Sequence, residues 1–454
     1  MRVDRRQFLC MTALALSSPA QSRTRPNILL VVADDLGWGD VSMNGRDSWQ
    51  TPNIDRLARE GTRFTRFYSG AAVCNPARAC LLTGKYGIHN GVKGYNDDLP
   101  SSETTIAESL RELGYDTALF GKWHRGQRPD GGHTHPVDQG WDEFLGFVTA
   151  REAWEHFPSW IHHNRGRVDA SGFASDIFAD AAIEFIARRR DHPFFVYLAF
   201  TEPHSWIEAP ESEVAKFRGK FDEADLGEPY NARYAAMITK MDESLGRVLD
   251  ALDREGLSDD TLVIFTSDQG ATFEPQNEGA SFYHDSNAPL RGQKRSLEEG
   301  GIRVPAAVRW PGRVPSGHTS DEVVHFIDLL PTLMAAAGGE SKIPRDVDGA
   351  NMLAVLEGKQ AGPERMLFWE WEADQGESGA DLDRLLMGRH AVRGVKMYAV
   401  MRGDLKLLDI NGARYLYDVA RDPSERRPLS TEYPELVASL HEALQEWKGT
   451  DITN

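Results

Sequence analysis

Polar side chains that can bind a cation and move protons follow each of four apolar runs in this chain. These side chains are acids, one amide, one lysine and two histidines: Asp34 and Asp35 after 28–33, Lys122 and His124 after 117–120, His204 after 194–200, and Asp268 and Gln269 after 262–266. If the runs are parallel strands of one sheet, their carboxyl ends meet at one edge, where open α/β sheets bind ligands. Any one group alone is better explained as a helix cap or a turn. Four together indicate a functional site.

The neighbouring carboxylates Asp34 and Asp35, with Asp268, indicate a metal site. Carboxylates gathered in one cleft repel one another, and a hard divalent cation relieves that repulsion. Oxygen ligands favour Ca²⁺ or Mg²⁺ over zinc, and Gln269 adds a neutral amide oxygen. The alternative is structural, with Asp34 and Asp35 holding a loop and Asp268 capping a helix.

A second chemical feature is the segment 74–84 (CNPARACLLTG). Pro76 suits the first turn of a helix, so Cys74 is expected at or near a helix N-terminus, where backbone amides favour an anion. Arg78 follows one turn later and is placed to neutralise charge. One interpretation is a thiolate nucleophile of lowered pKa. A thiolate is however a soft ligand, poorly matched to a calcium site of oxygen ligands, so the chemistry is more consistent if position 74 presents oxygen.

The elements that must position these groups indicate an α/β domain from Arg25 to about Gly339. The four apolar runs suit buried strands of a largely parallel sheet. Between them lie amphipathic segments expected to be helical: 54–60, 105–113, 177–190 and 234–256. The pattern then changes to short strands, at 398–402, 405–408 and 415–417, and a closing helix at 434–447. We therefore expect a catalytic domain at 25–362 and a smaller C-terminal α+β domain with an antiparallel sheet at 363–454.

Length and composition exclude several classes of protein. The chain has 454 residues with 41% hydrophobic and 26% charged residues, and its 41 Gly and 23 Pro show no period, unlike a collagenous or disordered protein. The net charge of −18 argues against non-specific nucleic-acid binding. Beyond the N-terminus, no apolar stretch is long enough to span a bilayer, so we expect no stable membrane insertion.

The first 20 residues are predicted to be a signal peptide. Arg5 and Arg6 precede a weakly apolar run and a small-residue cleavage site at 18–20, which resembles a twin-arginine (Tat) signal for export of folded proteins. The alternatives are a Sec signal or a disordered tail. Export places the mature protein in the periplasm or outside the cell. Cys74 and Cys80 are not expected to form a disulfide there, because six helical residues separate them by about 9 Å, beyond the roughly 7 Å that a disulfide bridges.

The chain resembles the type I, formylglycine-dependent sulfatases of the alkaline-phosphatase superfamily. The segment 74–84 matches their signature C-x-P-[SA]-R-x-x-x-L-T-G at every fixed position. Further blocks similar to the family span most of the chain: 34–40 (DDLGWGD), 51–55 (TPNID), 121–124 (GKWH), 267–270 (SDQG), 292–294 (GQK), 299–305 (EGGIRVP), 416–418 (LYD) and 422–425 (DPSE). The resemblance implies an alkaline-phosphatase-like fold, in which helices sandwich a large mixed, mostly parallel sheet beside a smaller C-terminal domain.

The resemblance also implies roles for single residues. Cys74 would be oxidised to Cα-formylglycine, and Ca²⁺, in preference to Mg²⁺, would be held by Asp34, Asp35, Asp268, Gln269 and residue 74. Arg78 and Lys122 would bind the formylglycine hydrate and the sulfate. His124 would accept the proton whose removal from the sulfated intermediate lets sulfate leave. His204 and Lys294 would face the leaving oxygen. Two departures occur: Gln269 replaces the common Asn, and Ser205-Trp206 follows His204 without the usual proline.

The implied reaction is hydrolysis of an organic sulfate ester on a small molecule or glycan, after a formylglycine-generating enzyme or maturase has acted on the chain. Two alternatives remain: a formylglycine-dependent phosphonate or phosphate ester hydrolase on the same fold, and a non-catalytic protein that binds sulfated glycans. Three aromatic segments suit an anionic sugar or a purely structural role: 154–165, 283–285 and 369–371.

Overall fold

The computed structural model describes residues 25–124, 134–223, 228–372 and 395–452. The predicted signal peptide, residues 1–20, lies outside the described residues. Within those ranges, no helix combines the length and the apolar character needed to cross a membrane.

A sheet of ten strands forms the centre of the molecule. Its strands, in spatial order, are β10 (His318–His325), β2 (Thr62–Tyr68), β9 (Arg303–Arg309), β8 (Thr261–Ser267), β1 (Asn27–Ala33), β7 (Phe194–Ala199), β3 (Asp116–Lys122), β4 (Glu143–Phe147), β5 (Trp160–His163) and β6 (Gly166–Asp169). The strands β8, β1, β7, β3 and β4 are parallel neighbours, whereas β9 and β5 run antiparallel to the strands beside them. The expected mixed, mostly parallel sheet is confirmed.

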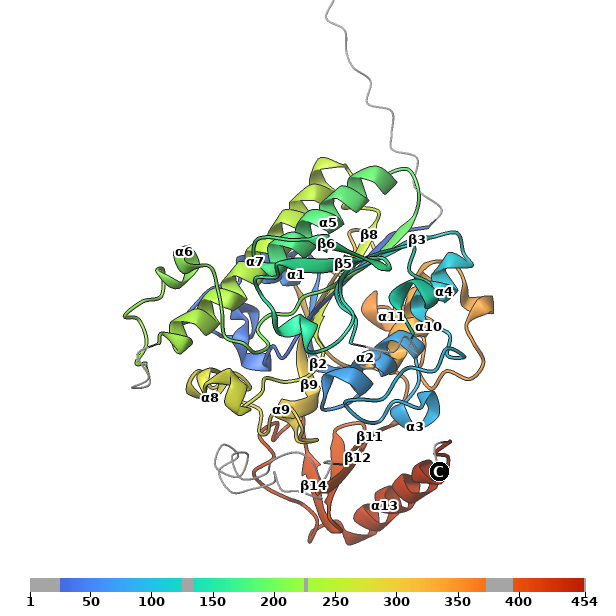
Figure 1. Cartoon of the computed structure of the whole chain (residues 1–454). Helices are drawn as coiled ribbons and strands as arrows, with labels where there is room; N and C mark the ends of the chain where they lie inside the picture. The colour runs from blue at the N-terminus through green and yellow to red at the C-terminus, as the bar shows by residue number, and fades with distance from the viewer. Residues whose placement is uncertain (1–24, 125–133, 224–227, 373–394, 453–454) are drawn as a thin grey trace, which may run out of the picture.

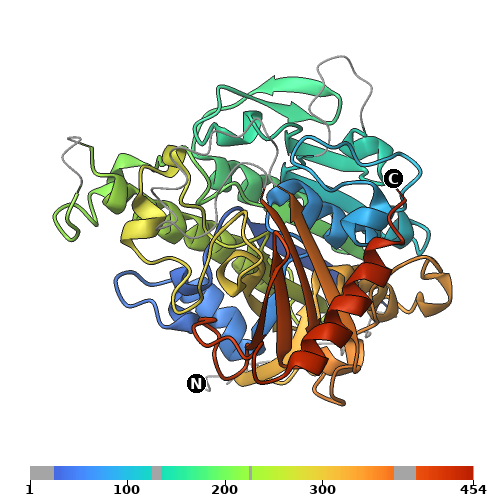
Figure 2. The ribbon, with the colours of Figure 1, turned by 90° about the horizontal axis from the view of Figure 1, so that it is seen from below.

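Helices cover both faces of this sheet because its central strands are apolar on both sides (Figures 1 and 2). In β1, Ile28, Leu30 and Val32 belong to one buried cluster, while Leu29 and Val31 belong to the other. The first cluster includes side chains of α2 (Cys74–Thr83), α4 (Ile106–Arg111) and α10 (Leu329–Ala336). The second includes side chains of α1 (Pro52–Glu60), α5 (Ala174–Arg189) and α7 (Tyr230–Arg254).

A separate four-stranded antiparallel sheet follows in the chain and is drawn in red and orange in Figure 2. Its strands are β11 (Met366–Glu372), β12 (Lys396–Arg402), β13 (Leu405–Ile410) and β14 (Ala413–Asp418), and α13 (Pro434–Lys448) packs on it. Its apolar core is continuous with the first cluster of the large sheet. The indole N–H of Trp369 donates to the Ser69 carbonyl at 2.8 Å, which joins β11 to the end of β2.

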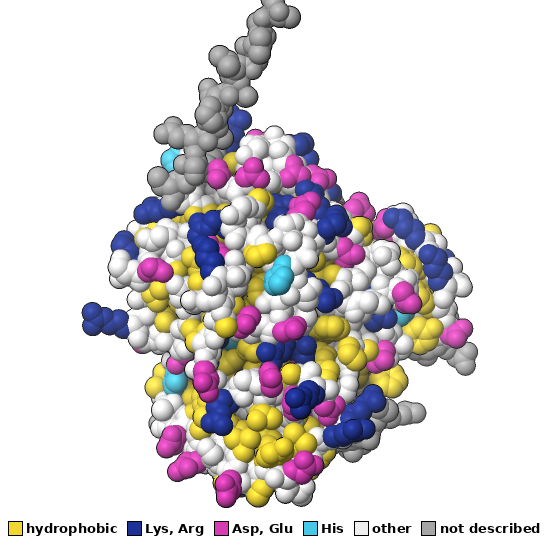
Figure 3. Space-filling view, turned by 180° about the vertical axis from the view of Figure 1, so that it is seen from behind, with side chains coloured by type: hydrophobic (Ala, Val, Ile, Leu, Met, Phe, Trp, Pro, Cys, Tyr) yellow, Lys and Arg dark blue, Asp and Glu magenta, His cyan; other side chains and the backbone are white. Residues whose placement is uncertain are grey.

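Among the described residues, five helices of four residues lie within the connections between the longer elements. They are α3 (Gly87–Asn90), α6 (Glu211–Val214), α8 (Ala280–Tyr283), α9 (Glu299–Ile302) and α11 (Leu353–Leu356). On the face seen in Figure 3, acidic and basic side chains are interspersed, so the net negative charge is not gathered there in one field.

The aromatic segment 154–165 begins at the last residue of a 3-10 helix (Glu152–Trp154) and contains strand β5, which with β6 extends the large sheet as a hairpin. The segment 369–371 lies inside β11. The strands β2, β4, β9, β10 and β11 were not predicted.

Candidate active site

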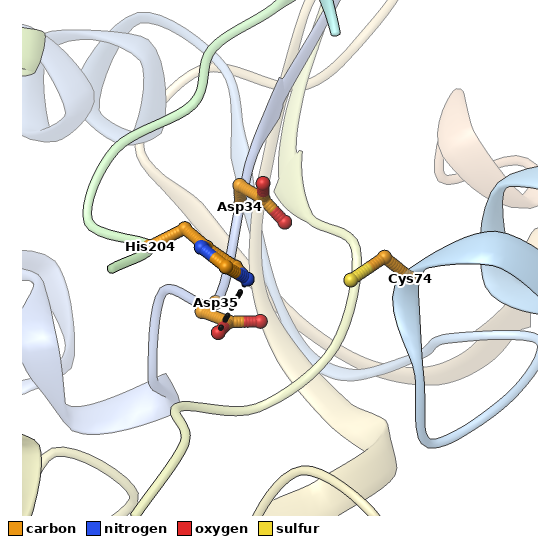
Figure 4. A group of neighbouring side chains, drawn as sticks. All are labelled: Asp34, Asp35, Cys74 and His204. Carbon is orange, nitrogen blue, oxygen red and sulfur yellow. Dashed lines mark ion pairs between the residues drawn. The ribbon is translucent and has the colours of Figure 1, made fainter. Parts of the chain in front are cut away.

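Four neighbouring parallel strands bring the predicted polar groups together. Strands β8, β1, β7 and β3 lie side by side, so the residues that follow them converge at one edge of the sheet. The ten predicted site residues are all buried: Asp34, Asp35, Cys74, Arg78, Lys122, His124, His204, Asp268, Gln269 and Lys294. Figure 4 shows four of them, with the Cys74 sulfur and the Asp34 carboxylate turned toward each other.

The three aspartates are interlinked. The backbone N–H of Asp35 donates to Asp268 Oδ1 at 3.1 Å. Burial raises the pKa of Asp268 to about 7, and the neighbouring charge of Asp34 adds to the rise. Burial acts on Asp34 in the same direction, but the positive charges of Lys122, His204 and Arg78 outweigh it and hold its pKa well below the ordinary value. The nearby cations therefore offset the cost of a buried negative charge at Asp34 but offset it only in part at Asp268.

Cys74 is the first residue of α2, as expected, and lies inside this group of carboxylates. Burial raises the pKa of its thiol to about 12. The thiol is therefore un-ionised at neutral pH, so the interpretation of Cys74 as a thiolate of lowered pKa is wrong for this geometry. Cys74 and Cys80 are both buried, and no disulfide joins them, as expected.

Three cations face the carboxylates. The Nε of Arg78 donates to Asp268 Oδ2 at 2.9 Å, and Lys122 Nζ lies 2.5 Å from Asp34 Oδ2. Lys294 Nζ lies 3.0 Å from Asp35 Oδ2. Each aspartate thus has a buried cation, so their mutual repulsion is already relieved in part without a metal ion.

The two histidines occupy different sides of the site. The Nδ1 atom of His204 lies 2.8 Å from the Ser205 carbonyl, which accepts a hydrogen bond from it, and Nε2 faces Lys294 Nζ at 3.3 Å and Asp35 Oδ2 at 3.7 Å. Burial lowers the pKa of His204. The ring of His124 lies 4.8 Å from that of Tyr95 in an edge-to-face contact.

Comparisons with known proteins agree with this geometry. A family model described as Sulfatase matches residues 26–339, and one described as N-sulphoglucosamine sulphohydrolase, C-terminal, matches residues 292–450. The chain belongs to the sulfatase family. It is 32% identical to human N-acetylgalactosamine-6-sulfatase, over 93% of this chain and 85% of that protein. It is 31% identical to rat arylsulfatase G, over 93% and 86% of the two chains.

Among solved structures, Ps i-CgsB in complex with k-i-k-neocarrahexaose is similar, with a TM-score of 0.79 and 27% identity over 94% of this chain and 93% of that one. This sulfatase therefore has the alkaline-phosphatase-like fold, and it is an enzyme that hydrolyses sulfate esters.

The buried donors of the sulfatase site fit a hard cation. One ligand atom each from Asp34, Asp35, Cys74 and His204 lies within 4.8 Å of the others. Asp34 Oδ1 and Gln269 Oε1 are buried and accept no hydrogen bond within the described part of the chain. Gln269 Nε2 instead donates to Asp35 Oδ1 and, at 3.6 Å, to Cys74 Sγ. Rotating this amide by 180° points its oxygen at Asp35 and Cys74 in place of the nitrogen, because the amide O and NH₂ occupy nearly the same space.

Sequence reasoning missed several residues around the site. Glu274 lies between Lys294 and Arg295, with Oε2 3.4 Å from Lys294 Nζ and Oε1 2.6 Å from Arg295 Nε. These cations, after the opposing effect of burial, hold its pKa below the ordinary value. Glu274 follows no strand directly and matches no family block, so neither strand position nor motif pointed to it.

The loop that carries His204 is held by a second buried histidine. His156 Nε2 lies 2.9 Å from the His204 carbonyl, and His156 Nδ1 lies 3.8 Å from Glu202 Oε1. Glu202 also accepts from the backbone N–H of Ser175 at 3.1 Å. Although it is two residues from His204, Glu202 thus supports the loop and α5 rather than the reacting centre.

Proposed function

We propose that this sulfatase removes sulfate from a sulfated carbohydrate, with a hydrated formylglycine at position 74 as nucleophile and Ca²⁺ as cofactor. The observation that carries the proposal is the placement of Cys74, un-ionised and buried, among oxygen donors and three cations at the N-terminus of α2. A neutral thiol is a weak nucleophile and a soft ligand. A geminal diol at the same position supplies the hard oxygen that the surrounding donors favour.

Formation of the nucleophile requires a partner enzyme. A formylglycine-generating enzyme or maturase would oxidise the Cβ–SH group by two electrons, using its own oxidant, so that sulfur leaves and Cβ becomes an aldehyde carbon. Water then adds to the aldehyde to give the diol. Because Cys74 is fully buried in the folded protein, this step takes place before folding is complete. Export by the predicted twin-arginine signal would follow it.

Asp34, Asp35, Asp268 and Gln269 would hold the cation, which supplies positive charge that favours ionisation of the diol. The ion pairs that Asp34 and Asp35 make in this structure explain why a bound cation would help substrate binding. Lys122 and Lys294 are now occupied by Asp34 and Asp35. With those carboxylates holding a divalent cation, both ammonium groups would be available to bind the sulfate oxygens, and Arg78 would hold charge beside them.

The reaction then proceeds in two steps. One diol oxygen would lose its proton to solvent and form a bond to sulfur, the bond from sulfur to the alcohol oxygen would break, and protonated His204 would donate its Nε2 proton to that oxygen. In the second step His124 accepts the proton of the other diol hydroxyl, the aldehyde re-forms, and the bond from Cβ to the sulfate oxygen breaks. Water rehydrates the aldehyde, so the overall reaction is an ester and water giving an alcohol and hydrogen sulfate.

A carbohydrate leaving group is supported by aromatic side chains beside His204. The ring of Trp154 stacks on His204, with ring centres 6.2 Å apart and planes at 18°, and Trp206 contacts Trp154 edge to face. Trp206 is 45% exposed, so its face is open to an incoming sugar. The similar proteins include N-acetylgalactosamine-6-sulfatase.

Turnover of matched esters tests the proposal. The purified enzyme should hydrolyse a sulfated monosaccharide and an aryl sulfate, lose activity in EDTA and regain it with Ca²⁺. A phosphonate monoester hydrolysed faster than every sulfate ester would instead indicate the phosphonate hydrolase alternative. Tight binding of sulfated glycan with no turnover by protein carrying formylglycine would indicate the non-catalytic alternative.

A further inference from the structure

A second cavity lies at the junction of the two sheets, beside the site described above. It has a volume of about 450 Å³. Its walls are the loop at 93–97, the strands β11 and β12, and the C-terminal end of α13. Figure 1 shows α3, which precedes that loop, next to β11.

Two contacts join this cavity to the catalytic residues. Tyr95 lines the cavity, and its ring contacts His124. The side chain of Asn75, the residue after Cys74, donates to the carbonyls of Gly94 at 3.0 Å and Asp97 at 2.7 Å. The loop that walls the cavity is thus attached directly to the N-terminus of α2.

The wall of the cavity formed by β11 is also connected to the catalytic residues. Trp371 on β11 lines the cavity, and the Arg295 guanidinium lies 5.8 Å from its ring centre. Arg295 follows Lys294 in the chain. A group bound in this cavity is therefore next to both the His124 and the Lys294 sides of the catalytic centre.

The lysines that line the cavity are engaged already. Lys93 Nζ lies 2.7 Å from Asp451, and Lys396 Nζ lies 2.7 Å from Glu372. Lys448 Nζ lies 3.6 Å from the centre of the Tyr398 ring. With these partners, and with further carboxylates in the lining, the cavity disfavours a second sulfate group. Carboxylate oxygens and aromatic rings suit the hydroxyls and C–H faces of an uncharged sugar.

Glu370 has a carboxylate oxygen in this cavity that could accept a hydrogen bond from a ligand. Its Oε1 is buried, lines the same cavity and has no hydrogen-bond partner among the described residues. Burial raises the pKa of this carboxyl to about 7. Buried polar atoms are nearly always hydrogen-bonded in folded proteins, and a sugar hydroxyl is a donor of the right kind.

We propose that this cavity binds an uncharged sugar unit linked to the sulfated one, with Glu370 accepting a hydroxyl hydrogen bond and Trp371 and Tyr95 contacting the ring. The inference rests on the proposed function, because it assigns the neighbour of the sulfated sugar. It means that the enzyme acts on an oligosaccharide in which a neutral unit adjoins the sulfated unit.

The test compares substrates that do and do not reach the cavity. Glu370→Ala should lower kcat/KM about tenfold on a sulfated disaccharide with a neutral neighbour, mainly through KM, because a buried partner is lost. It should leave kcat/KM on an aryl sulfate unchanged. Glu370→Gln keeps an acceptor oxygen and should restore part of the loss. Glu442→Gln, at an exposed position on α13, is the matched control and should change neither substrate.

Equal losses on both substrates would mean a structural role and would overturn the proposal, as would a wild-type preference for a disaccharide whose second unit is also sulfated. Lactose binding, measured by saturation-transfer NMR, separates this proposal from the proposed function. If no sulfate ester is hydrolysed but lactose binds and Glu370→Ala abolishes the signal, the cavity assignment stands alone. If lactose leaves no signal on the wild-type protein, the cavity assignment fails whatever the activity.

Discussion

Lys122 and Asp34 are completely buried, and the lysine Nζ lies 2.5 Å from Asp34 Oδ2. The pair comes from the ends of two different strands, β3 and β1. Lys122 holds the pKa of Asp34 down against the effect of burial. The same ammonium group is assigned to the substrate sulfate, so Asp34 and the sulfate compete for its N–H donors. A cation on Asp34 makes that exchange favourable because the carboxylate keeps a partner.

Removal of the cation should therefore affect both stability and substrate binding. Dialysis against EDTA should lower Tm, since a ligand at a hundredfold excess over its Kd contributes about 3 kcal/mol to the free energy of unfolding. It should also raise KM for an aryl sulfate, because Lys122 stays paired with Asp34. Calcium should restore both values, and Mg²⁺ should restore them less. An unchanged Tm and rate, with no calcium found by elemental analysis, would contradict the assigned metal site.

The chemical identity of residue 74 is open to mass spectrometry. Cleavage after Arg66 and Arg78 should release a peptide, residues 67–78, that contains Cys74 as its only cysteine. In active enzyme the peptide should have the mass of formylglycine, react with a hydrazide and resist thiol alkylation. Cys74→Ala should fold and bind calcium but lose nearly all turnover.

Cys80 offers the matched control for that experiment. It lies on the same helix, is buried, and packs against Gly70, whose added Cβ would lie 2.3 Å from the Cys80 Cβ. Cys80→Ala should keep its activity and lose about 1 kcal/mol of stability through the small cavity it leaves. Fully active protein in which residue 74 is alkylated as a thiol would contradict the nucleophile assignment.

The site was predictable wherever a polar residue directly follows a hydrophobic strand, as Asp34 follows β1 and Asp268 follows β8. There, strand order and side-chain type alone place the residue at one edge of the sheet. Lys294 lies in a loop between short helices, so only the family resemblance identified it. Glu274 has neither kind of signal, because its position depends on how the separate segment between β8 and α8 folds back toward Lys294.

Three of the strands that were not predicted, β2, β9 and β10, have a common physical cause. Strand β2 reads Thr-Arg-Phe-Thr-Arg-Phe-Tyr, and β10 carries His, Asp and Glu, because both lie toward one edge of the large sheet and are only partly buried. Strand β9 has a proline at position 305 and is antiparallel to its neighbours. Such strands lack the continuous apolar run that marks the central parallel strands.

The two catalytic histidines should respond differently to substitution. His204→Ala removes the proton donor to the leaving oxygen, so it should reduce kcat on an alkyl or sugar sulfate far more than on an activated aryl sulfate. His124→Ala should instead slow the release of sulfate and allow a sulfated enzyme to accumulate, which intact-protein mass spectrometry detects. Equal losses on both leaving groups for His204→Ala would exclude it as the acid.

Lys406 on β13 should be essential for the stability of the interface between the sheets. Its Nζ is buried and lies 2.8 Å from Glu299 Oε1 and 2.9 Å from Glu425 Oε1. Lys406→Ala removes the buried cation that Glu299 and Glu425 share, although Glu299 keeps Arg303 Nη1 at 3.4 Å, so we expect a loss of about 3–5 kcal/mol in denaturant unfolding. Adding Glu299→Gln and Glu425→Gln to Lys406→Met should recover much of that loss. Lys359→Ala, at an exposed position, should cost little and serves as the control; a similarly small cost for Lys406→Ala would contradict the argument.

Asp242 on α7 should make stability fall as pH rises through a defined range. Its carboxylate is buried and accepts from the backbone N–H groups of Asn53 and Ile54 at the start of α1, at 3.1 Å and 2.8 Å. Burial raises its pKa to about 6 in the folded protein, and those hydrogen bonds oppose the rise only in part. The native state therefore binds more protons than the unfolded state between about pH 4 and pH 6. The stabilisation from the protonated carboxyl is fully present below that range and is lost above it.

Over this range the contribution of Asp242 to the free energy of unfolding should fall by about 3 kcal/mol, from a shift of about two pKa units. Asp242→Asn cannot titrate, so the wild type should lose stability relative to this variant between pH 4 and pH 7 by about that amount. Glu243→Gln, the exposed neighbour on α7, corrects for the change in net charge. Urea unfolding of the three proteins at several pH values measures the difference. A difference that stays constant with pH, or grows in favour of the wild type, would mean that hydrogen bonding from α1 outweighs burial and keeps this carboxylate ionised.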